Sequence, residues 1–189
     1  MILTGNEDLR VVKTIEGIKS AFEDLICEKD YEKITVKELC ERARINKKTF
    51  YHYYPTLDDL LAEMQMELSS VYINKVKDYQ LPDDIEKVNR EFFLFSDGQG
   101  LAYEKITTSG SYDYVRSKMI GKVMDATWKR SDRFSALAPL EQNILMNYMN
   151  SVSIGIYKQW VAEGKKTPID KVIMIANNLL LGGMKGFFE

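Results

Sequence analysis

The stretch from residue 35 to residue 61 contains helix start and stop signals in close succession, and this limits what the chain can fold into. Thr35 and Glu38 have the spacing of a capping box, in which each side chain binds a free backbone N–H group at the start of a helix. Apolar residues then recur at intervals of three and four, at Val36, Leu39, Cys40 and Ala43. This pattern predicts an amphipathic helix of about two and a half turns.

A second short helix is predicted over residues 47–53, after a turn through residues 44–45. Asn46 is a good N-cap for it. Pro55 ends it, because the residue before a proline is pushed out of the α region. Thr56 then caps the next helix. Two helices this short and this close form a helix-turn-helix, whose second helix enters the major groove of DNA.

The predicted turn and second helix are locally basic. Between Arg42 and Tyr53 there are four basic residues and no acidic one, as a phosphate surface requires. The alternative is a solvated helix with a chance basic cluster, which the two capping patterns and the turn disfavour. The residues expected to line the DNA face are Thr35, Arg44, Lys47, Lys48, Thr49, Tyr51, His52, Tyr53 and Thr56.

The stretch TVKELCERARINKKTFYHYYPTLDDLL resembles the DNA-binding signature of the TetR/AcrR family of transcriptional regulators. The resemblance covers the N-terminal third of the chain, including Thr-Phe-Tyr-x-Tyr-Tyr in the second short helix. Two positions depart from the family pattern. Arg44 stands where the family usually has glycine, so a left-handed backbone there is uncommon. Leu57 stands where the family often has a lysine that binds a phosphate.

The remaining periodicity is helical, so the predicted fold class is all-α. A first helix from about residue 8 to 28 completes an N-terminal three-helix domain, 8–55. A long helix from Leu57 to about Asp78 leads into a second helical domain, 56–189, expected to bind an effector and to dimerise. Its further helices are predicted after residue 84 and over 101–106, 112–130, 139–163 and 169–186, with 131–138 polar and irregular.

Composition excludes several classes of function. The net charge of −2 argues against generic, charge-driven binding to nucleic acid, so DNA contact must rest on a local basic face. Cys27 and Cys40 are the only cysteines and lack C-x-x-C spacing, which indicates a reduced, cytoplasmic protein with both in the core. The N-terminus does not resemble a signal peptide, and no apolar run is long enough to span a membrane.

No constellation of catalytic or metal-binding residues is present in the sequence. His52 is the only histidine and lies in the predicted recognition helix. The glycines form neither a G-x-G-x-x-G motif nor a P-loop. We therefore expect no catalytic residue, no metal and no cofactor, and an enzyme is the least favoured class of function.

The C-terminal half is expected to form a homodimer, mainly because the family resemblance implies one. The segment SVSIGIYKQWVAEGKKTPIDKV more distantly resembles a subgroup that includes activators of dihydroxyacetone kinase operons. The alternative is that both predicted helix faces pack within one subunit. The residues expected at the dimer interface are Tyr148, Ser151, Val152, Gly155, Ile156, Gln159, Ile173, Ala176, Asn177, Leu180 and Met184.

The same half is rich in methionine and aromatic residues, which suit a pocket for an apolar or amphipathic small molecule. A well-filled core explains the same residues equally well, and no charge cluster identifies a ligand. The candidate pocket residues are Phe92, Phe95, Tyr103, Tyr112, Met119, Trp128, Met146 and Met149.

These patterns predict a homodimeric regulator that binds a palindromic operator in double-stranded DNA and does not bind membranes. We expect a repressor that a small-molecule effector releases. The alternative is a protein of the same fold that has lost or altered DNA binding and acts as an interaction protein or activator subunit. Arg44 and Leu57 keep that alternative open.

Overall fold

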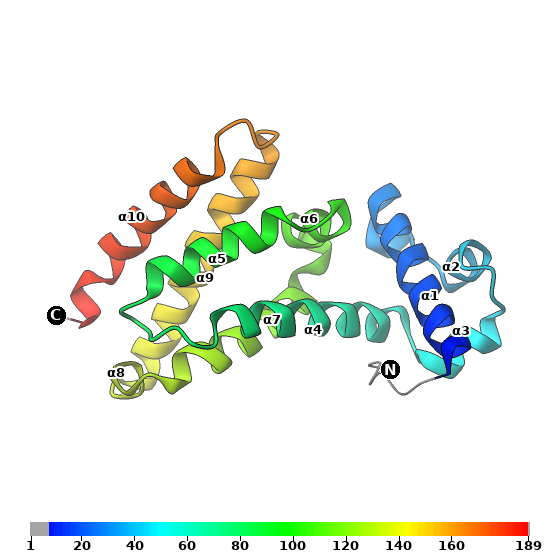
Figure 1. Ribbon diagram of the computed structural model, residues 1–189, viewed down its shortest axis with the longest axis horizontal. Helices are drawn as coiled ribbons and strands as arrows, with labels where there is room; N and C mark the ends of the chain where they lie inside the picture. Colours follow the sequence, from blue (N-terminus) through cyan, green and yellow to red (C-terminus); the bar gives the residue numbers. More distant parts are fainter. Residues whose placement is uncertain (1–7, 189) are drawn as a thin grey trace. The chain divides into compact units, whose positions relative to one another are not determined.

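The computed structural model describes residues 8–188, except for the side chains of residues 113, 115, 116 and 186–188. The described chain is built from helices, which confirms the all-α prediction (Figure 1). It divides into two packing units. The first runs to Leu68 and adds Leu101–Arg116, and the second consists of Ser69–Gly100 and the chain from Ser117 onward.

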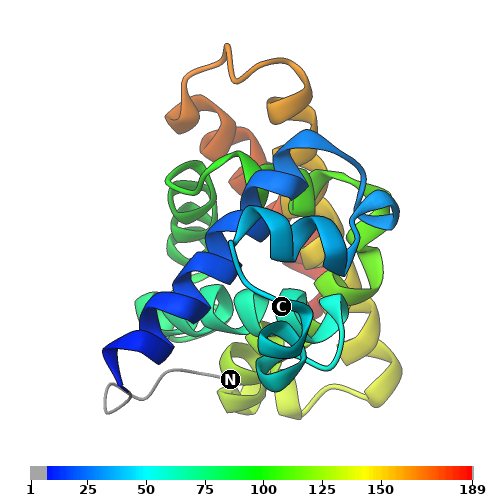
Figure 2. The same cartoon turned by 90° about the vertical axis from the view of Figure 1, so that its right-hand side faces the viewer.

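The first unit contains the helix-turn-helix. Its elements are α1 (Leu9–Glu28), η1 (Tyr31–Lys33), α2 (Val36–Arg42), α3 (Lys47–Tyr53), the first part of α4 (Leu57–Val76), α6 (Leu101–Thr108), η2 (Gly110–Tyr112) and the start of α7 (Asp113–Thr127). In Figure 2, α1 runs past the two short helices α2 and α3.

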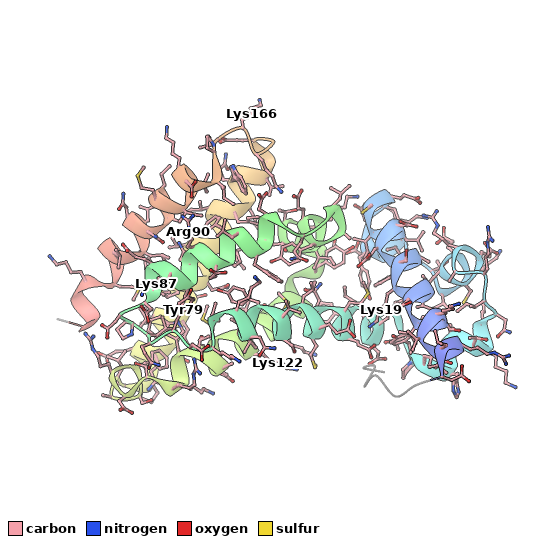
Figure 3. The ribbon with its side chains drawn as sticks, viewed as in Figure 1. Lys19, Tyr79, Lys87, Arg90, Lys122 and Lys166 are labelled. Carbon is pink, nitrogen blue, oxygen red and sulfur yellow. The ribbon has the colours of Figure 1, made fainter. Side chains whose placement is uncertain are left out.

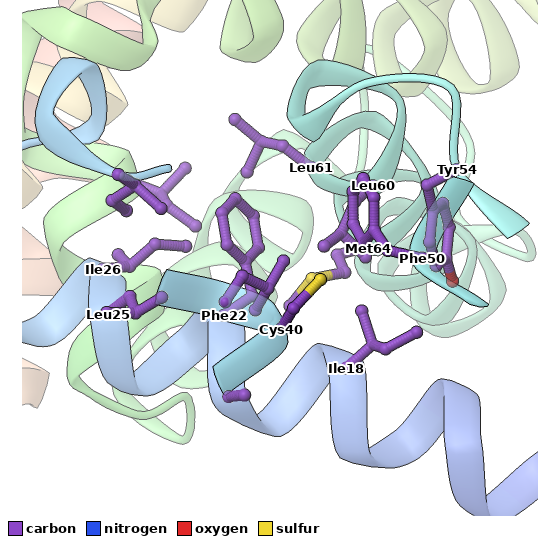
Figure 4. Packing of buried hydrophobic residues seen from close by; sticks show 14 of the residues in the cluster. Ile18, Phe22, Leu25, Ile26, Cys40, Phe50, Tyr54, Leu60, Leu61 and Met64 are labelled. Carbon is purple, nitrogen blue, oxygen red and sulfur yellow. The ribbon is translucent and has the colours of Figure 1, made fainter. Parts of the chain in front are cut away.

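The core of the first unit forms where the apolar faces of these helices meet (Figure 4). Phe22, Leu39 and Phe50 are fully buried at its centre, and Ile45 packs against them from a partly buried position. Ile106 and Tyr112 belong to the same core. The unit therefore includes α6 and the first part of α4, whereas the sequence pattern placed the domain boundary at residues 55/56.

Side chains cap the helices of the first unit. Asp8 accepts the N–H of Arg10 (2.8 Å) at the start of α1. Thr35 and Glu38 form the predicted capping box of α2. Asn46 accepts the N–H of Thr49 (2.8 Å) at the start of α3. Because these bonds link residues within three positions, local sequence is sufficient to predict them.

The second unit contains the remainder of α4 and α7 together with α5 (Ile85–Asp97), η3 (Trp128–Arg130), α8 (Asp132–Ser135), α9 (Pro139–Ala162) and α10 (Ile169–Phe188). One core cluster of this unit comprises Leu81, Ile85, Trp128, Phe134, Leu145, Met149, Leu180 and Met184.

The prediction that residues 131–138 are irregular is wrong for α8. Ser131 caps this short helix by accepting the N–H of Phe134 (3.2 Å). The Phe134 side chain is buried against Trp128, with 5.4 Å between ring centroids. The buried aromatic side chain stabilises a turn that has too few residues to show helical periodicity.

Candidate nucleic-acid interface

The turn between α2 and α3 is closed by hydrogen bonds to the end of α2. The N–H of Arg44 donates to the Glu41 carbonyl (3.3 Å), and that of Ile45 donates to the Cys40 carbonyl (3.0 Å). Arg44 has a φ of 54°, in the left-handed region that favours glycine. The turn therefore adopts a conformation uncommon for arginine, and the Arg44 side chain is exposed beside α3.

Helix α3 has one buried anchor and an exposed polar face. Phe50 is fully buried, and the predicted DNA-face residues Lys47, Lys48, Tyr51 and His52 are exposed. Thr49 and Tyr53 are half-buried. The hydroxyl of Thr49 donates to Asn46 Oδ1 (3.1 Å), and the rings of His52 and Tyr53 are in edge contact at 4.9 Å.

The basic residues of this region differ in their partners. Arg42 forms a bidentate ion pair with Glu28 at the end of α1, with distances of 2.5 and 2.8 Å. Within the described chain, Arg44, Lys47 and Lys48 have no carboxylate partner. Three exposed cations are therefore available to an anionic ligand such as a DNA phosphate.

Two threonines of the predicted DNA face form hydrogen bonds with carboxylates at the starts of helices. The Thr35 hydroxyl donates to Glu38 Oε2 (2.9 Å), and the Thr56 hydroxyl donates to Asp59 Oδ2 (2.7 Å). Both residues are exposed, but each hydroxyl proton is already bound. In this structure neither hydroxyl offers a free donor to a phosphate oxygen.

A tyrosine pair near the start of α4 was not foreseen from the sequence. The hydroxyl of Tyr31 donates to the carboxylate of Asp58. Burial, followed by this hydrogen bond, raises the pKa of Tyr31 well above its ordinary value. Tyr114, on α7, shares the same carboxylate, and burial followed by that bond raises the pKa of Tyr114 to about 12. No local pattern predicts such contacts, because the three residues are far apart in sequence.

The eight candidate pocket residues are divided between the two packing units. Tyr103 and Tyr112 are in the first unit, and Tyr112 lies in its core. The others are in the second unit: Trp128 and Met149 lie in its core with Met146 against them, Phe92 contacts Tyr157, Phe95 contacts Tyr72, and Met119 is half-buried on α7.

A groove of about 510 Å³ in the second unit has a different lining. Pro82, Ile85 and Met184 are its buried apolar residues, and Glu86, Arg133 and Lys185 bring charges of both signs. None of the eight candidate pocket residues lines it.

The predicted dimer face on α10 needs a correction. Ile173, Ala176, Leu180 and Met184 are at most 4% exposed, so they are buried within the single chain. Asn177 accepts a hydrogen bond from Asn89 (2.7 Å) of the same chain. The exposed apolar residues of α10 are instead Met174, Ile175, Leu179 and Leu181.

On α9 the predicted face is mixed. Ser151, Gly155 and Gln159 are exposed, Val152 and Ile156 are half-buried, and the Tyr148 hydroxyl donates to the Leu179 carbonyl (2.6 Å). Leu140 and Ile144, which the sequence analysis did not select, are 69% and 51% exposed.

In the part of the chain that the structure covers, no helix is long and apolar enough to cross a membrane. Among the same residues, no group of three or more His, Cys, Asp or Glu side chains is placed to hold a metal ion.

Residues 18–64 match the family model of bacterial regulatory proteins of the tetR family. Over 178 residues the chain is 24% identical to the HTH-type dhaKLM operon transcriptional activator DhaS of Lactococcus lactis. This match covers 90% of this chain and 90% of DhaS. It is also 26% identical over 172 residues to the uncharacterized HTH-type transcriptional regulator YxbF of Bacillus subtilis. That match covers 85% of this chain but only 43% of YxbF.

Solved structures share the fold. A TetR transcriptional regulator from Streptococcus agalactiae aligns with a TM-score of 0.70 at 19% identity, over 90% of this chain and 95% of that one. The transcriptional regulator FadR of Bacillus subtilis, in complex with stearoyl-CoA, aligns with a TM-score of 0.64 at 14% identity, over 87% and 95% of the two chains.

Proposed function

The chain belongs to the TetR family of bacterial regulatory proteins, and we propose that it binds a palindromic operator as a homodimer. The observation that carries this proposal is the exposed face of α3, where Lys47 and Lys48 have no carboxylate partner and lie next to Arg44. In a helix-turn-helix, such a face meets base edges and phosphates in the major groove. Lys47 and Lys48 are proposed to donate to guanine or phosphate.

The proposed dimer face is the exposed side of α9 and α10. On α10, Ile175 and Leu179 are four residues apart and so share a helix face, and Leu140 and Ile144 do the same on α9. Large apolar side chains left in water favour burial against another surface. Pairing this face with its copy across a two-fold axis produces one α3 for each half of a palindrome.

We propose repression relieved by an amphipathic small molecule as the mode of regulation. The methionine and aromatic content of the second unit supports such a ligand, and the structurally similar FadR binds stearoyl-CoA. Activation is a second candidate, because the DhaS relative, similar over 90% of its length, is an activator.

The test of DNA binding starts with selection of duplexes from a random-sequence pool by the purified protein. We expect enrichment of one palindromic sequence. Lys47→Ala with Lys48→Ala should weaken binding and reduce the salt slope by about 1–2. Lys166→Ala with Lys171→Ala removes the same charge from exposed sites of the second unit and should leave binding unchanged.

If the protein enriches no sequence and shows no salt-dependent retention on DNA, the operator proposal fails and the interaction protein is favoured. Transcription from the native promoter that carries the selected operator distinguishes repression from activation. Stearoyl-CoA is the first effector probe, and release of the operator duplex is the readout.

A further inference from the structure

A nearly buried lysine joins α1 to α4 next to the end of α3. The side chain of Lys19, labelled in Figure 3, extends from α1. It is 16% exposed. Its Nζ lies 2.6 Å from Glu67 Oε1 and 3.3 Å from Glu63 Oε1. The two acids are four residues apart on α4, so they lie on one face of that helix and share this cation.

Glu63 also binds the residue that ends the recognition helix. The Tyr54 hydroxyl donates to Glu63 Oε1 (2.9 Å). Tyr54 is the C-cap of α3, is 1% exposed, and packs its ring against Phe50 at 5.9 Å (Figure 4). Burial, followed by the charge of Glu67, raises the pKa of Tyr54 to about 12.

Helix α3 needs such external support because it has only seven residues. A helix this short does not hold its conformation or direction alone, and tertiary contacts must fix it. Phe50 anchors its middle and Asn46 caps its start. The bond from Tyr54 to a charged acceptor fixes its other end, and charge-assisted bonds of this kind are strong.

The positive charge of Lys19 stabilises the Glu63 carboxylate in the position where it accepts the hydrogen bond from Tyr54. The side chain of Glu63 is 10% exposed, and a carboxylate with so little access to water needs a cation or several donors. Without Lys19, the charges of Glu63 and Glu67 would repel each other across one helical turn. Glu63 would then turn toward water and leave Tyr54.

We propose that Lys19 and Glu63 are positioning residues for DNA binding, which hold the end of α3 against α1 and α4 through the Tyr54 hydroxyl. This inference rests on the proposed function and adds residues that do not touch DNA. Sequence-specific contacts require α3 in one orientation, whereas phosphate attraction requires only nearby charge. Loss of this clamp therefore lowers affinity for the operator more than affinity for unrelated DNA.

The test uses the duplex that the wild-type protein enriches from the random pool, and an unrelated duplex of equal length. Tyr54→Phe removes only the hydroxyl. We expect its affinity for the selected duplex to fall about tenfold, with an unchanged salt slope and unchanged affinity for the unrelated duplex. Lys19→Met should do the same, and Lys19→Arg, which keeps the charge, should restore most of the affinity.

Tyr72→Phe is the matched control. Tyr72 is 8% exposed and its hydroxyl donates to the Val88 carbonyl (3.1 Å) in the second unit, so this variant loses a comparable buried hydrogen bond away from α3. It should bind the selected duplex like wild type. All affinities are measured well below the midpoint of thermal unfolding, where a purely stabilising role of Tyr54 would leave binding unchanged.

Wild-type affinity of folded Tyr54→Phe for the selected duplex overturns the inference, even if Lys19→Met does not fold. Equal losses on both duplexes also overturn it, because they indicate a lost electrostatic contact and not a misplaced helix. If the wild-type protein enriches no sequence, the proposed function fails and this inference fails with it.

Discussion

The ring of Tyr148 fills the space that a side chain at Gly183 would need. A Cβ atom built at Gly183 would overlap the Tyr148 hydroxyl and ring. That hydroxyl donates to the Leu179 carbonyl (2.6 Å), one helical turn before Gly183. The pair thus allows α9 and α10 to approach closely within one chain, and Tyr148, which was predicted at the dimer face, makes this internal contact.

Gly183→Ala should therefore destabilise the protein by about 1–3 kcal/mol, because the added methyl group displaces a packed ring. The measurement is urea unfolding. Gly121, on α7, is the control, since a Cβ there would meet nothing within 4 Å. Gly121→Ala should stabilise by about 0.5–1 kcal/mol through helix propensity. Equal effects of the two substitutions would show that Tyr148 moves aside freely.

Arg44→Gly should change stability and DNA binding in opposite directions. The left-handed backbone at Arg44 costs the folded state about 1–2 kcal/mol, and Arg44→Gly removes this cost. The extra conformational freedom of glycine in the unfolded chain lowers the free energy of unfolding by about 0.4–1 kcal/mol and so offsets part of that gain in stability. We expect a net stabilisation of about 0.5–1 kcal/mol. Operator affinity should fall because an exposed cation is lost.

Arg44→Lys separates these effects. It keeps the charge and also keeps a side chain in the left-handed turn, so affinity should be retained without a gain in stability. Unfolding in urea and titration of the selected duplex give both quantities. A glycine variant that binds as tightly as wild type would remove Arg44 from the DNA face.

The helix-turn-helix could be predicted from sequence because its signals are local. The bonds of Thr35 with Glu38 and of Asn46 with Thr49 each span three residues. The contacts of Lys19 with Glu63 and of Tyr31 with Asp58 join residues far apart in sequence, and no periodicity encodes them. A lysine on an amphipathic helix suggests a solvated face, but Lys19 is nearly buried.

The face of α10 was assigned wrongly for a related reason. Residues 172–184 are apolar around most of the helix, so periodicity does not tell the buried side from the exposed one. Packing decides it: Leu180 is 1% exposed and its neighbour Leu179 is 53% exposed.

Leu179→Glu tests the corrected face. The side chain is exposed in the subunit, so the fold should tolerate the charge, whereas a dimer would have to bury it. We expect the dimer dissociation constant to rise at least about tenfold in sedimentation experiments. Leu101→Glu, at a 57% exposed residue of α6, is the control and should leave association unchanged. An unaltered Leu179→Glu dimer would move the interface elsewhere.

Tyr112→Phe should stabilise the protein, although it removes a polar group from the core. The Tyr112 hydroxyl is buried without a hydrogen-bond partner among the described residues. Removing an unsatisfied group recovers its desolvation cost, about 1 kcal/mol. Tyr157→Phe is the comparison, because that buried hydroxyl donates to the Ser96 carbonyl (3.2 Å), and its loss should cost about 1 kcal/mol. Destabilisation by both would indicate that a water molecule satisfies Tyr112.

The same hydroxyl should make stability sensitive to alkali. Burial, followed by the charges of Glu32 and Asp30, raises the pKa of Tyr112 from 10.0 to about 12. The folded chain therefore keeps the Tyr112 proton at pH values where the unfolded chain has released it. Because of this difference, the free energy of unfolding is unaffected by this group below pH 10 and falls as the pH rises toward 12. Urea unfolding across this window should show a shallower loss of stability for Tyr112→Phe than for wild type. If the Tyr112 hydroxyl were hydrated in the folded protein, Tyr112→Phe would follow the wild-type curve instead.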